Sequence, residues 1–356
     1  MLVSHLPNSP SGVDAAWLTE ALGVAQPGTH VRGIERVDTI HGAGTKLQLR
    51  VDYEANPSGL PEMLWVKAGW EEHSALTGAS GAYVREAVFF DSLQQPGVRA
   101  PCAFFSAWTA AGDGLIIMED LHRRGAELWT CTAARSVADV AAMLETLATL
   151  HASWWNSPGL LALDWIDIPI RSSGPSSAWP RANGAERLRE VLSGPRGEGL
   201  PSHVKDPQRI ERTFWRMVED LEAMPAGCLI HGDTHPGNCF SDADGGAGLY
   251  DWQSIARGPW AFDVAYHIVT SLTPEDRRRS ERDLLRHYRA ALARLGVNDV
   301  PSEAEAWDLY RRYIAYPLLI WPTNHISHQA EENIQTLTYR LGIAADDFGL
   351  FDLWSI

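Results

Sequence analysis

A short polar segment of this 356-residue chain carries residue types suited to proton transfer and metal binding. Residues 231–238 read HGDTHPGN and directly follow the apolar run CLI, and Asp251 ends a second apolar run soon afterwards. The carboxylate of Asp233 could accept the proton of a hydroxyl group. Asn238 and Asp251 offer hard oxygen ligands of the kind that Mg²⁺ prefers. We therefore expect a site where a hydroxyl group is activated beside a magnesium ion.

A second interpretation of the same segment stays open at this point. His231, Asp233 and His235 are side chains that transition metals accept as ligands, so the segment could belong to a metallohydrolase. That alternative gives no role to Asn238 or Asp251, which the magnesium interpretation uses.

The spacing from Asp233 to Asn238 matches the catalytic loop HRDxxxxN of protein kinases, with Gly232 in place of arginine. Together with the string YDWQSIARGPWAFDVAYH at 250–267, it resembles the aminoglycoside phosphotransferase and choline kinase family, most of all its ecdysteroid kinase-like subgroup. The resemblance implies an α+β, bilobal protein-kinase-like fold. Its N-terminal lobe would hold an antiparallel sheet plus a helix, and its larger C-terminal lobe would be mainly helical.

The resemblance also implies roles for residues along the chain. Asp233 would be the catalytic base, Asn238 and Asp251 the metal ligands, and Lys67, oriented by Glu86, would hold the α- and β-phosphates. A glycine-bearing hairpin would cover the phosphates, and the segment after LIIM would be the hinge that meets adenine. The hairpin and hinge residues are Gly42, Ala43, Gly44, Thr45, Met118, Glu119 and Leu121, with His231, His235 and Asp263 as supporting residues.

These residues need elements to hold them, and the apolar periodicity predicts which. Residues 46–53 alternate apolar and polar side chains as a half-buried strand does, and 34–40, 63–66 and 115–118 are further predicted strands. Helices are expected at 13–23, 82–93, 136–151 and 207–224, with short strands at 228–230 and 247–250 and a mainly helical remainder. The many Gly, Pro and Ser residues of 157–202 predict an irregular, partly mobile insertion. The mixed charges of 276–283 predict a solvated helix face. The expected division is an N-terminal lobe at 1–118, a hinge at 119–122 and a C-terminal lobe at 123–356.

Composition excludes several classes of protein. A net charge of −15 argues against binding to nucleic acid. Four scattered cysteines predict free thiols, and the first residues do not form a secretory signal. The most apolar stretch, 314–321, contains Pro317 and is far shorter than the roughly 20 residues that span a bilayer. We expect a soluble, cytoplasmic protein that binds no membrane, and the sequence leaves its oligomeric state open.

The expected reaction is transfer of the γ-phosphoryl group of ATP, with GTP as the alternative, to a hydroxyl of a small molecule in the presence of Mg²⁺. Trp252 and Gln253 replace the second and third residues of the kinase DFG motif, and no long activation segment follows, which argues against protein substrates. A nucleotide-binding pseudokinase is disfavoured because the base, the lysine and both metal ligands are all present.

The residues expected along the acceptor are aromatic rather than acidic. They are Trp154, Trp155, Tyr316, Trp321 and His325. A polycationic aminoglycoside would need several facing carboxylates, so the sequence favours an uncharged or apolar alcohol, such as a steroid-, terpenoid- or polyketide-like molecule. An aminoglycoside kinase and a hydroxyacyl-thioester kinase are the alternatives.

Overall fold

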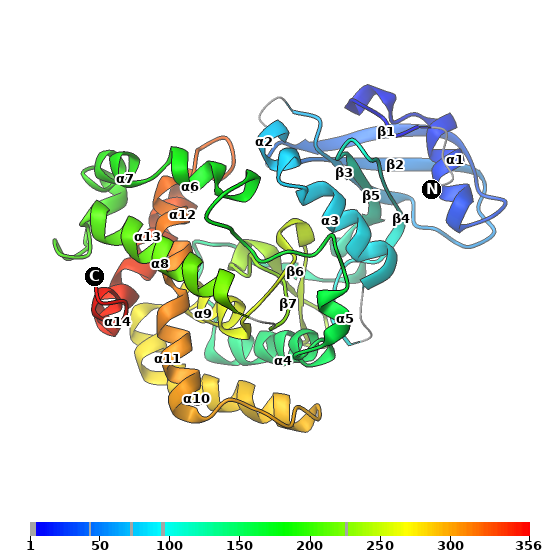
Figure 1. Ribbon diagram of the computed structural model, residues 1–356. Helices are drawn as coiled ribbons and strands as arrows, with labels where there is room; N and C mark the ends of the chain where they lie inside the picture. The colour runs from blue at the N-terminus through cyan, green and yellow to red at the C-terminus, as the bar shows by residue number, and fades with distance from the viewer. Residues whose placement is uncertain (1–4, 43, 72–73, 94–96, 225–226) are drawn as a thin grey trace. The chain divides into compact units, whose positions relative to one another are not determined.

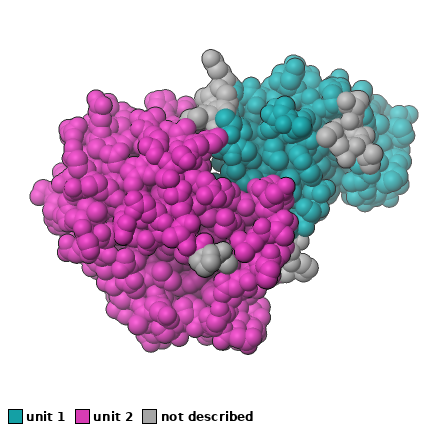
Figure 2. Space-filling model, viewed as in Figure 1, with its two compact units in different colours: residues 1–94, 100–127, 250–254 teal, residues 95–99, 128–249, 255–356 magenta. Residues whose placement is uncertain are grey.

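The computed structural model describes residues 5–42, 44–71, 74–93, 97–224 and 227–356 (Figure 1). Contacts divide the chain into two compact units, which Figure 2 colours separately. The first comprises residues 1–94, 100–127 and 250–254, and the second comprises 95–99, 128–249 and 255–356. Asp251 thus belongs by its contacts to the first unit, and Asp233 and Asn238 belong to the second. The division into two lobes with a hinge at 119–122, expected from the sequence, stays a prediction.

The first unit is built on a five-stranded antiparallel sheet in the order β1–β2–β3–β5–β4. The strands are β1 (His30–Ile40), β2 (Thr45–Ala55), β3 (Met63–Ala68), β4 (Ala103–Trp108) and β5 (Gly114–Glu119). Its helices are α1 (Ala15–Ala25), α2 (Ser74–Ala79) and α3 (Ala82–Val88), with a π-helical turn at Phe89–Leu93 and 3₁₀ turns at Pro10–Gly12, Leu121–Arg124 and Trp252–Ser254. Strand β4 was not predicted from the sequence.

Alternation along β2 gives the sheet one apolar and one polar face. Leu47, Leu49 and Val51 are buried in a core that α1 closes, together with Leu64 and Val66 of β3. Residues between them point to the opposite face, because successive side chains of a strand alternate. Lys46 and Lys67 lie on that polar face and are direct partners in the β2–β3 register. The pairing therefore places two lysines side by side away from the apolar core.

The second unit is mainly helical. Its long helices are α4 (Val137–Ser153), α8 (Pro207–Ala223), α9 (Trp260–Ser271), α10 (Pro274–Arg294), α11 (Glu303–Tyr313), α12 (Ala315–Thr323) and α13 (Glu331–Phe348), followed by α14 (Leu350–Leu353). Short strands form two small sheets: β6 (Glu127–Leu128), β8 (Cys239–Ser241) and β9 (Ala247–Leu249), and β7 (Cys228–Ile230) with β10 (Ala256–Gly258). The predicted α+β class, with an antiparallel sheet in one part and mostly helices in the other, is confirmed.

Two local predictions need correction. The segment 157–202 is not wholly irregular, since it contains α5 (Pro158–Leu161), α6 (Ala178–Ala182), α7 (Ala185–Leu192) and 3₁₀ turns at Pro175–Ser177 and Pro195–Gly197. The mixed-charge run 276–283 is not simply solvated, because Arg277 and Glu281 are buried and form an ion pair at 2.8 Å. Among the described residues, no helix combines the length and apolarity needed to cross a membrane.

Candidate active site

The first unit gathers the predicted lysine and two carboxylates at the polar face of the sheet. Lys67 Nζ lies 2.7 Å from Glu86 Oε2 of α3 and 2.7 Å from Asp251 Oδ1. The Lys67 and Glu86 side chains are 2% and 4% exposed. Burial alone would lower the pKa of Lys67, but the Asp251 and Glu86 carboxylates hold it above its ordinary value. Lys67 is therefore a fixed cation with its partners already in place.

Glu86 also anchors the segment that carries Asp251. Its Oε1 accepts the backbone N–H of Trp252 at 3.0 Å, and the Trp252 ring stacks on Phe89 with centroids 3.9 Å apart. Burial raises the pKa of Glu86, while the charge of Lys67 acts in the opposite direction. Asp251 itself has a φ of 65°, a left-handed conformation that is uncommon outside glycine. Trp252, where kinases have phenylalanine, thus packs this strained turn against α3.

The glycine-bearing hairpin joins β1 to β2 and lies close to the Lys67 side chain. A Cβ on Gly44 would lie 3.1 Å from the Tyr83 ring and 3.5 Å from Lys67 Cε, so a larger residue would require the Tyr83 ring to shift by a few tenths of an ångström. The Thr45 hydroxyl donates to Glu71 Oε1 at 3.1 Å. Gly42 lies in the turn before Gly44, and the predicted site residue Ala43 falls outside the described residues.

The predicted hinge is the end of β5 and the 3₁₀ turn after it. Met118 and Glu119 close β5, and Leu121 opens the turn that Asp120 caps. The Glu119 N–H donates to the Cys102 carbonyl at 2.9 Å, and the Leu121 carbonyl accepts from Ala126 N–H at 3.1 Å. The role of these residues in binding adenine stays a prediction.

In the second unit, Asp233 lies in a loop between β7 and β8 and receives hydrogen bonds on both carboxylate oxygens. The Tyr266 hydroxyl donates to Oδ1 at 3.0 Å, and Asn238 Nδ2 donates to Oδ2 at 3.0 Å. Trp321 Nε1 of α12 donates in turn to the Tyr266 hydroxyl at 2.5 Å. Burial raises the pKa of Tyr266 well above its ordinary value, so the phenol stays protonated and acts as a donor. Asp233 remains 27% exposed and can meet a substrate from the open side.

Asp263 of α9 binds the backbone at the start of the loop between β7 and β8. Its two oxygens accept the N–H groups of His231 at 2.7 Å and Gly232 at 2.9 Å. His151 of α4 lies 3.2 Å from Asp263 Oδ2, and His231 Nδ1 accepts the Asp233 N–H at 3.3 Å. Asp263 and His231 therefore bind the loop backbone, whereas the Asp233 carboxylate accepts from the side chains of Tyr266 and Asn238.

His235 places a positive charge beside Asp233. Its Nε2 lies 3.5 Å from Asp233 Oδ2, and its Nδ1 lies 3.5 Å from Cys131 Sγ. Burial alone would lower the pKa of His235, but the Asp233 carboxylate and Cys131 raise it to about 10. His235 also packs edge-on against Trp321, with centroids 5.0 Å apart. The imidazolium is thus held between the base and a buried indole.

The residues predicted along the acceptor differ in their surroundings. Trp321 is 2% exposed and donates its indole N–H to Tyr266, and its role along the acceptor stays a prediction. Tyr316 is half-buried among Phe214, Phe262 and Tyr266. His325 is exposed, and its Nδ1 accepts the Ser327 N–H at 3.1 Å. Trp154 and Trp155 are half-buried, and in the described part of the chain their indole N–H groups lack a hydrogen-bond partner.

Two residues of the site were missed from the sequence. Tyr266 lies three residues after Asp263, a spacing that puts both on one face of α9 and could have indicated a shared role. Lys46 ends the hairpin motif, and its Nζ lies 3.4 Å from Asp251 Oδ2 and 6.0 Å from the centre of the Tyr250 ring. The strand register that pairs Lys46 with Lys67 was the signal available there.

Mg²⁺ binding by Asn238 and Asp251 stays a prediction, and both side chains offer oxygen donors of the kind that Mg²⁺ prefers. Asn238 Nδ2 makes both of the hydrogen bonds of that amide to Asp233, so the hard Oδ1 oxygen is left to act as a ligand, as the Asp251 carboxylate can. Within the described residues, no three His, Cys, Asp or Glu side chains are arranged to hold a metal ion. The metallohydrolase alternative therefore has no ligand cluster among His231, Asp233 and His235.

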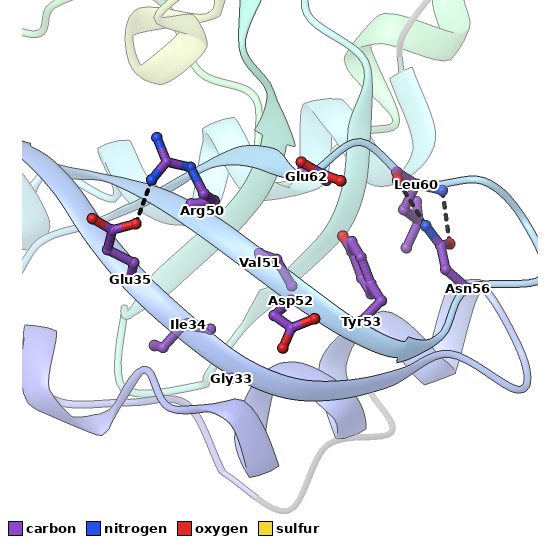
Figure 3. Close-up of a pocket in the computed structure, with 10 residues that line it drawn as sticks. All are labelled: Gly33, Ile34, Glu35, Arg50, Val51, Asp52, Tyr53, Asn56, Leu60 and Glu62. Carbon is purple, nitrogen blue, oxygen red and sulfur yellow. Dashed lines mark hydrogen bonds and ion pairs between the residues drawn. The ribbon is translucent and has the colours of Figure 1, made fainter.

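A separate hollow of about 620 Å³ lies on the hairpin of β1 and β2 (Figure 3). Two pairs of lining residues bond to each other: Arg50 pairs with Glu35, and Asn56 exchanges two hydrogen bonds of 2.8 Å with the backbone of Leu60. None of the predicted site residues lines this hollow. It is a feature of the sheet rather than part of the candidate site.

Comparison with known proteins places the chain in a family. The sequence model of the phosphotransferase enzyme family, APH, matches residues 77–298, which is more than half of the chain. The comparison with curated proteins found no match.

Among solved structures, the chain is similar to choline kinase LicA from Streptococcus pneumoniae, with 13% identity, a TM-score of 0.46 and coverage of 89% of this chain and 94% of that one. It is also similar to an ethanolamine kinase from Plasmodium vivax, with 10% identity, a TM-score of 0.49 and coverage of 88% and 81%. A macrolide 2'-phosphotransferase type I has 14% identity, a TM-score of 0.44 and coverage of 90% and 94%. The family match confirms the predicted class of small-molecule kinase: the chain belongs to the phosphotransferase enzyme family.

Proposed function

We propose that this kinase transfers the γ-phosphoryl group of ATP to a hydroxyl of an uncharged or apolar alcohol. Asp233 is the base: it orients the acceptor hydroxyl and takes its proton as the oxygen attacks phosphorus. The observation that carries this role is the pair of donors, Tyr266 and Asn238, that fix both carboxylate oxygens while the group remains 27% exposed. Positioning of this kind is the main source of catalysis in phosphoryl transfer.

The nucleotide is held by the first unit in this proposal. Lys67, kept charged and oriented by Glu86, binds the α- and β-phosphates, and the glycine-bearing hairpin covers them. Asn238 and Asp251 would hold Mg²⁺, which neutralises the charge that builds between the β- and γ-phosphates. The Glu119 carbonyl and the Leu121 N–H would bind adenine, and GTP is the alternative nucleotide.

The acceptor class is supported by the charges and rings around Asp233. The imidazolium of His235 lies 3.5 Å from the carboxylate, so a polycationic acceptor would bring like charges together there. Tyr316 is half-buried, and its ring lies 6.4 Å from that of Tyr266, which donates to Asp233, so a partly exposed aromatic ring near the base favours an apolar molecule. Aminoglycosides and hydroxyacyl thioesters are the alternative acceptors.

The test is a screen of ATP consumption with Mg²⁺ across neutral, apolar, acidic and polycationic alcohols, with Asp233→Asn as the matched inactive variant. We expect turnover with uncharged or apolar alcohols that this variant loses while its affinity for ATP is kept. Preference for polycationic aminoglycosides would overturn the acceptor class. Tight binding of ATP without turnover of any acceptor would favour a pseudokinase.

A further inference from the structure

Lysine is rare in this chain, and its placement is not random. Of the 30 Lys and Arg residues only three are lysines, at positions 46, 67 and 205. Two of the three are direct partners in the β2–β3 register and share the polar face of the sheet. Like charges directly opposite each other destabilise an antiparallel pair. Such a pair is expected where an anion binds between the two side chains.

Asp251 is one such anion, and each of the two lysines contacts a different oxygen of its carboxylate. Lys67 lies 2.7 Å from Oδ1, and Lys46 lies 3.4 Å from Oδ2. The two lysines differ in access, because the Lys67 side chain is 2% exposed and that of Lys46 is 25% exposed. Lys67 is fully engaged by Glu86 and Asp251, whereas Lys46 has a longer contact and an open side. Lys46 can therefore turn to a second anion without leaving the sheet.

The chemistry of a lysine suits a mobile phosphate. Its ammonium group is a compact charge with three donors on a flexible stem, whereas arginine offers a rigid planar fork. Lys46 directly follows Gly44 and Thr45 of the hairpin proposed to cover the phosphates, and that hairpin lacks the third glycine of the protein-kinase loop. In a chain with a net charge of −15, a polyphosphate also needs local cations to offset repulsion.

We propose that Lys46 binds the terminal phosphate of a nucleoside triphosphate, on the side of Asp251 opposite to Lys67. The inference rests on the proposed function, in which Lys67 binds the α- and β-phosphates. Lys46 contacts the other oxygen of Asp251 and is 25% exposed, so with Lys67 on the α- and β-phosphates the γ-phosphate is the one left for Lys46. Lys46 would thus favour ATP over ADP and hold the γ-phosphate in line with the acceptor.

The test measures the affinities for ATP and ADP by calorimetry in Mg²⁺ for the wild type and five variants, of which the fifth is Lys67→Met. Lys46→Met should weaken ATP binding roughly tenfold and ADP binding about twofold at most, since a hydrogen bond to one charged phosphate is lost. Lys46→Arg should restore most of the difference between the affinities for ATP and ADP. Arg50→Met, on the same strand but exposed, and Lys205→Met should leave both affinities unchanged.

Equal weakening of ATP and ADP by Lys46→Met, or no weakening, would overturn the inference. The melting temperature without nucleotide separates binding from folding, and we expect Lys46→Met to shift it by no more than the Arg50→Met control. A large loss of stability with an unchanged preference for ATP would also overturn the inference. If the wild type itself binds neither nucleotide, the proposed function fails first. If Lys67→Met abolishes binding while Lys46→Met has no effect, the role of Lys46 alone fails.

Discussion

The hydroxyl of Tyr266 donates to Oδ1 of Asp233 at 3.0 Å, and the donor is itself held by Trp321. Both supporting side chains are buried, so they reach the carboxylate from inside the unit, and the Asp233 side chain stays 27% exposed. A base held in this way keeps its position when the acceptor enters. Tyr266 and Trp321 are therefore positioning residues for Asp233 under the proposed mechanism.

Tyr266→Phe should lower kcat roughly tenfold to hundredfold, because a hydrogen bond to a charged group is removed from the base. The affinity for ATP should not change, since the contacts of Tyr266 within the described residues are with Asp233, Trp321, Thr270, His235 and Tyr316, none of which is proposed to bind the nucleotide. Mg²⁺-dependent phosphorylation of the acceptor found by the screen measures the effect. Tyr310→Phe is the matched control, because its buried hydroxyl donates to Glu281 at 3.0 Å instead. Equal losses in the two variants would contradict the positioning role.

Lys67→Ala should destabilise the protein by about 3–5 kcal/mol, because it leaves the buried Glu86 carboxylate without its cation. Glu86→Ala should cost less, because Lys67 keeps Asp251 as a partner at 2.7 Å. The double variant should cost less than the sum of the two single losses, since neither charge then remains. Urea unfolding monitored by circular dichroism gives the three free energies. Additive losses would show that the two side chains are not energetically coupled.

Gly69→Ala should destabilise the first unit by about 1–3 kcal/mol, as overpacking commonly does. A Cβ at this position would lie 2.1 Å from Tyr83 Cε2, and the ring is itself confined beside Gly44. Gly33→Ala on β1 is the control, since nothing lies within 4 Å of its Cβ. Thermal unfolding should separate the two variants, and similar melting temperatures would show that Tyr83 can move aside.

Much of the sheet could be predicted from the sequence because its alternation is local. Leu47, Leu49 and Val51 define the buried face of β2 without any knowledge of the partner strands. Strand β4 was missed because its sequence AFFSAW has apolar residues on both faces and no clear period. Helix α7 was missed because the glycines, prolines and serines around it weaken the pattern.

The candidate site could be predicted only where a motif fixes its order along the chain. Asp233, Asn238 and Asp251 follow from such a motif. Tyr266 and Trp321 do not, because their hydrogen bond joins residues 55 positions apart and depends on how α9 and α12 pack. The role of Lys46 depends on strand register, which a periodic pattern alone does not specify.

Arg196→Met should loosen the segment 157–202. The Arg196 guanidinium pairs with Glu331 at 2.6 Å and donates to the carbonyls of Pro322 and Asn324 at 2.7 and 2.8 Å, although the side chain is only 8% exposed. Methionine cannot donate a hydrogen bond, so the carbonyls of Pro322 and Asn324 lose the donor that Arg196 supplies. Limited proteolysis should cut within 157–202 several times faster than in the wild type. Arg187→Met, which loses only an exposed pair with Glu190, should be cut at the wild-type rate.

The charge of His235 should make stability depend on pH. Its pKa is about 10 in the folded protein and near the ordinary 6.5 when unfolded, so the folded state binds this proton more tightly. The stabilisation is complete below about pH 6.5 and is lost as the pH rises from there towards 10. His235→Gln keeps a donor near Asp233 but cannot titrate, so its free energy of unfolding should fall less steeply with pH. Urea titrations from pH 6 to 9 compare the slopes, and parallel curves would show that His235 is not charged in the folded protein.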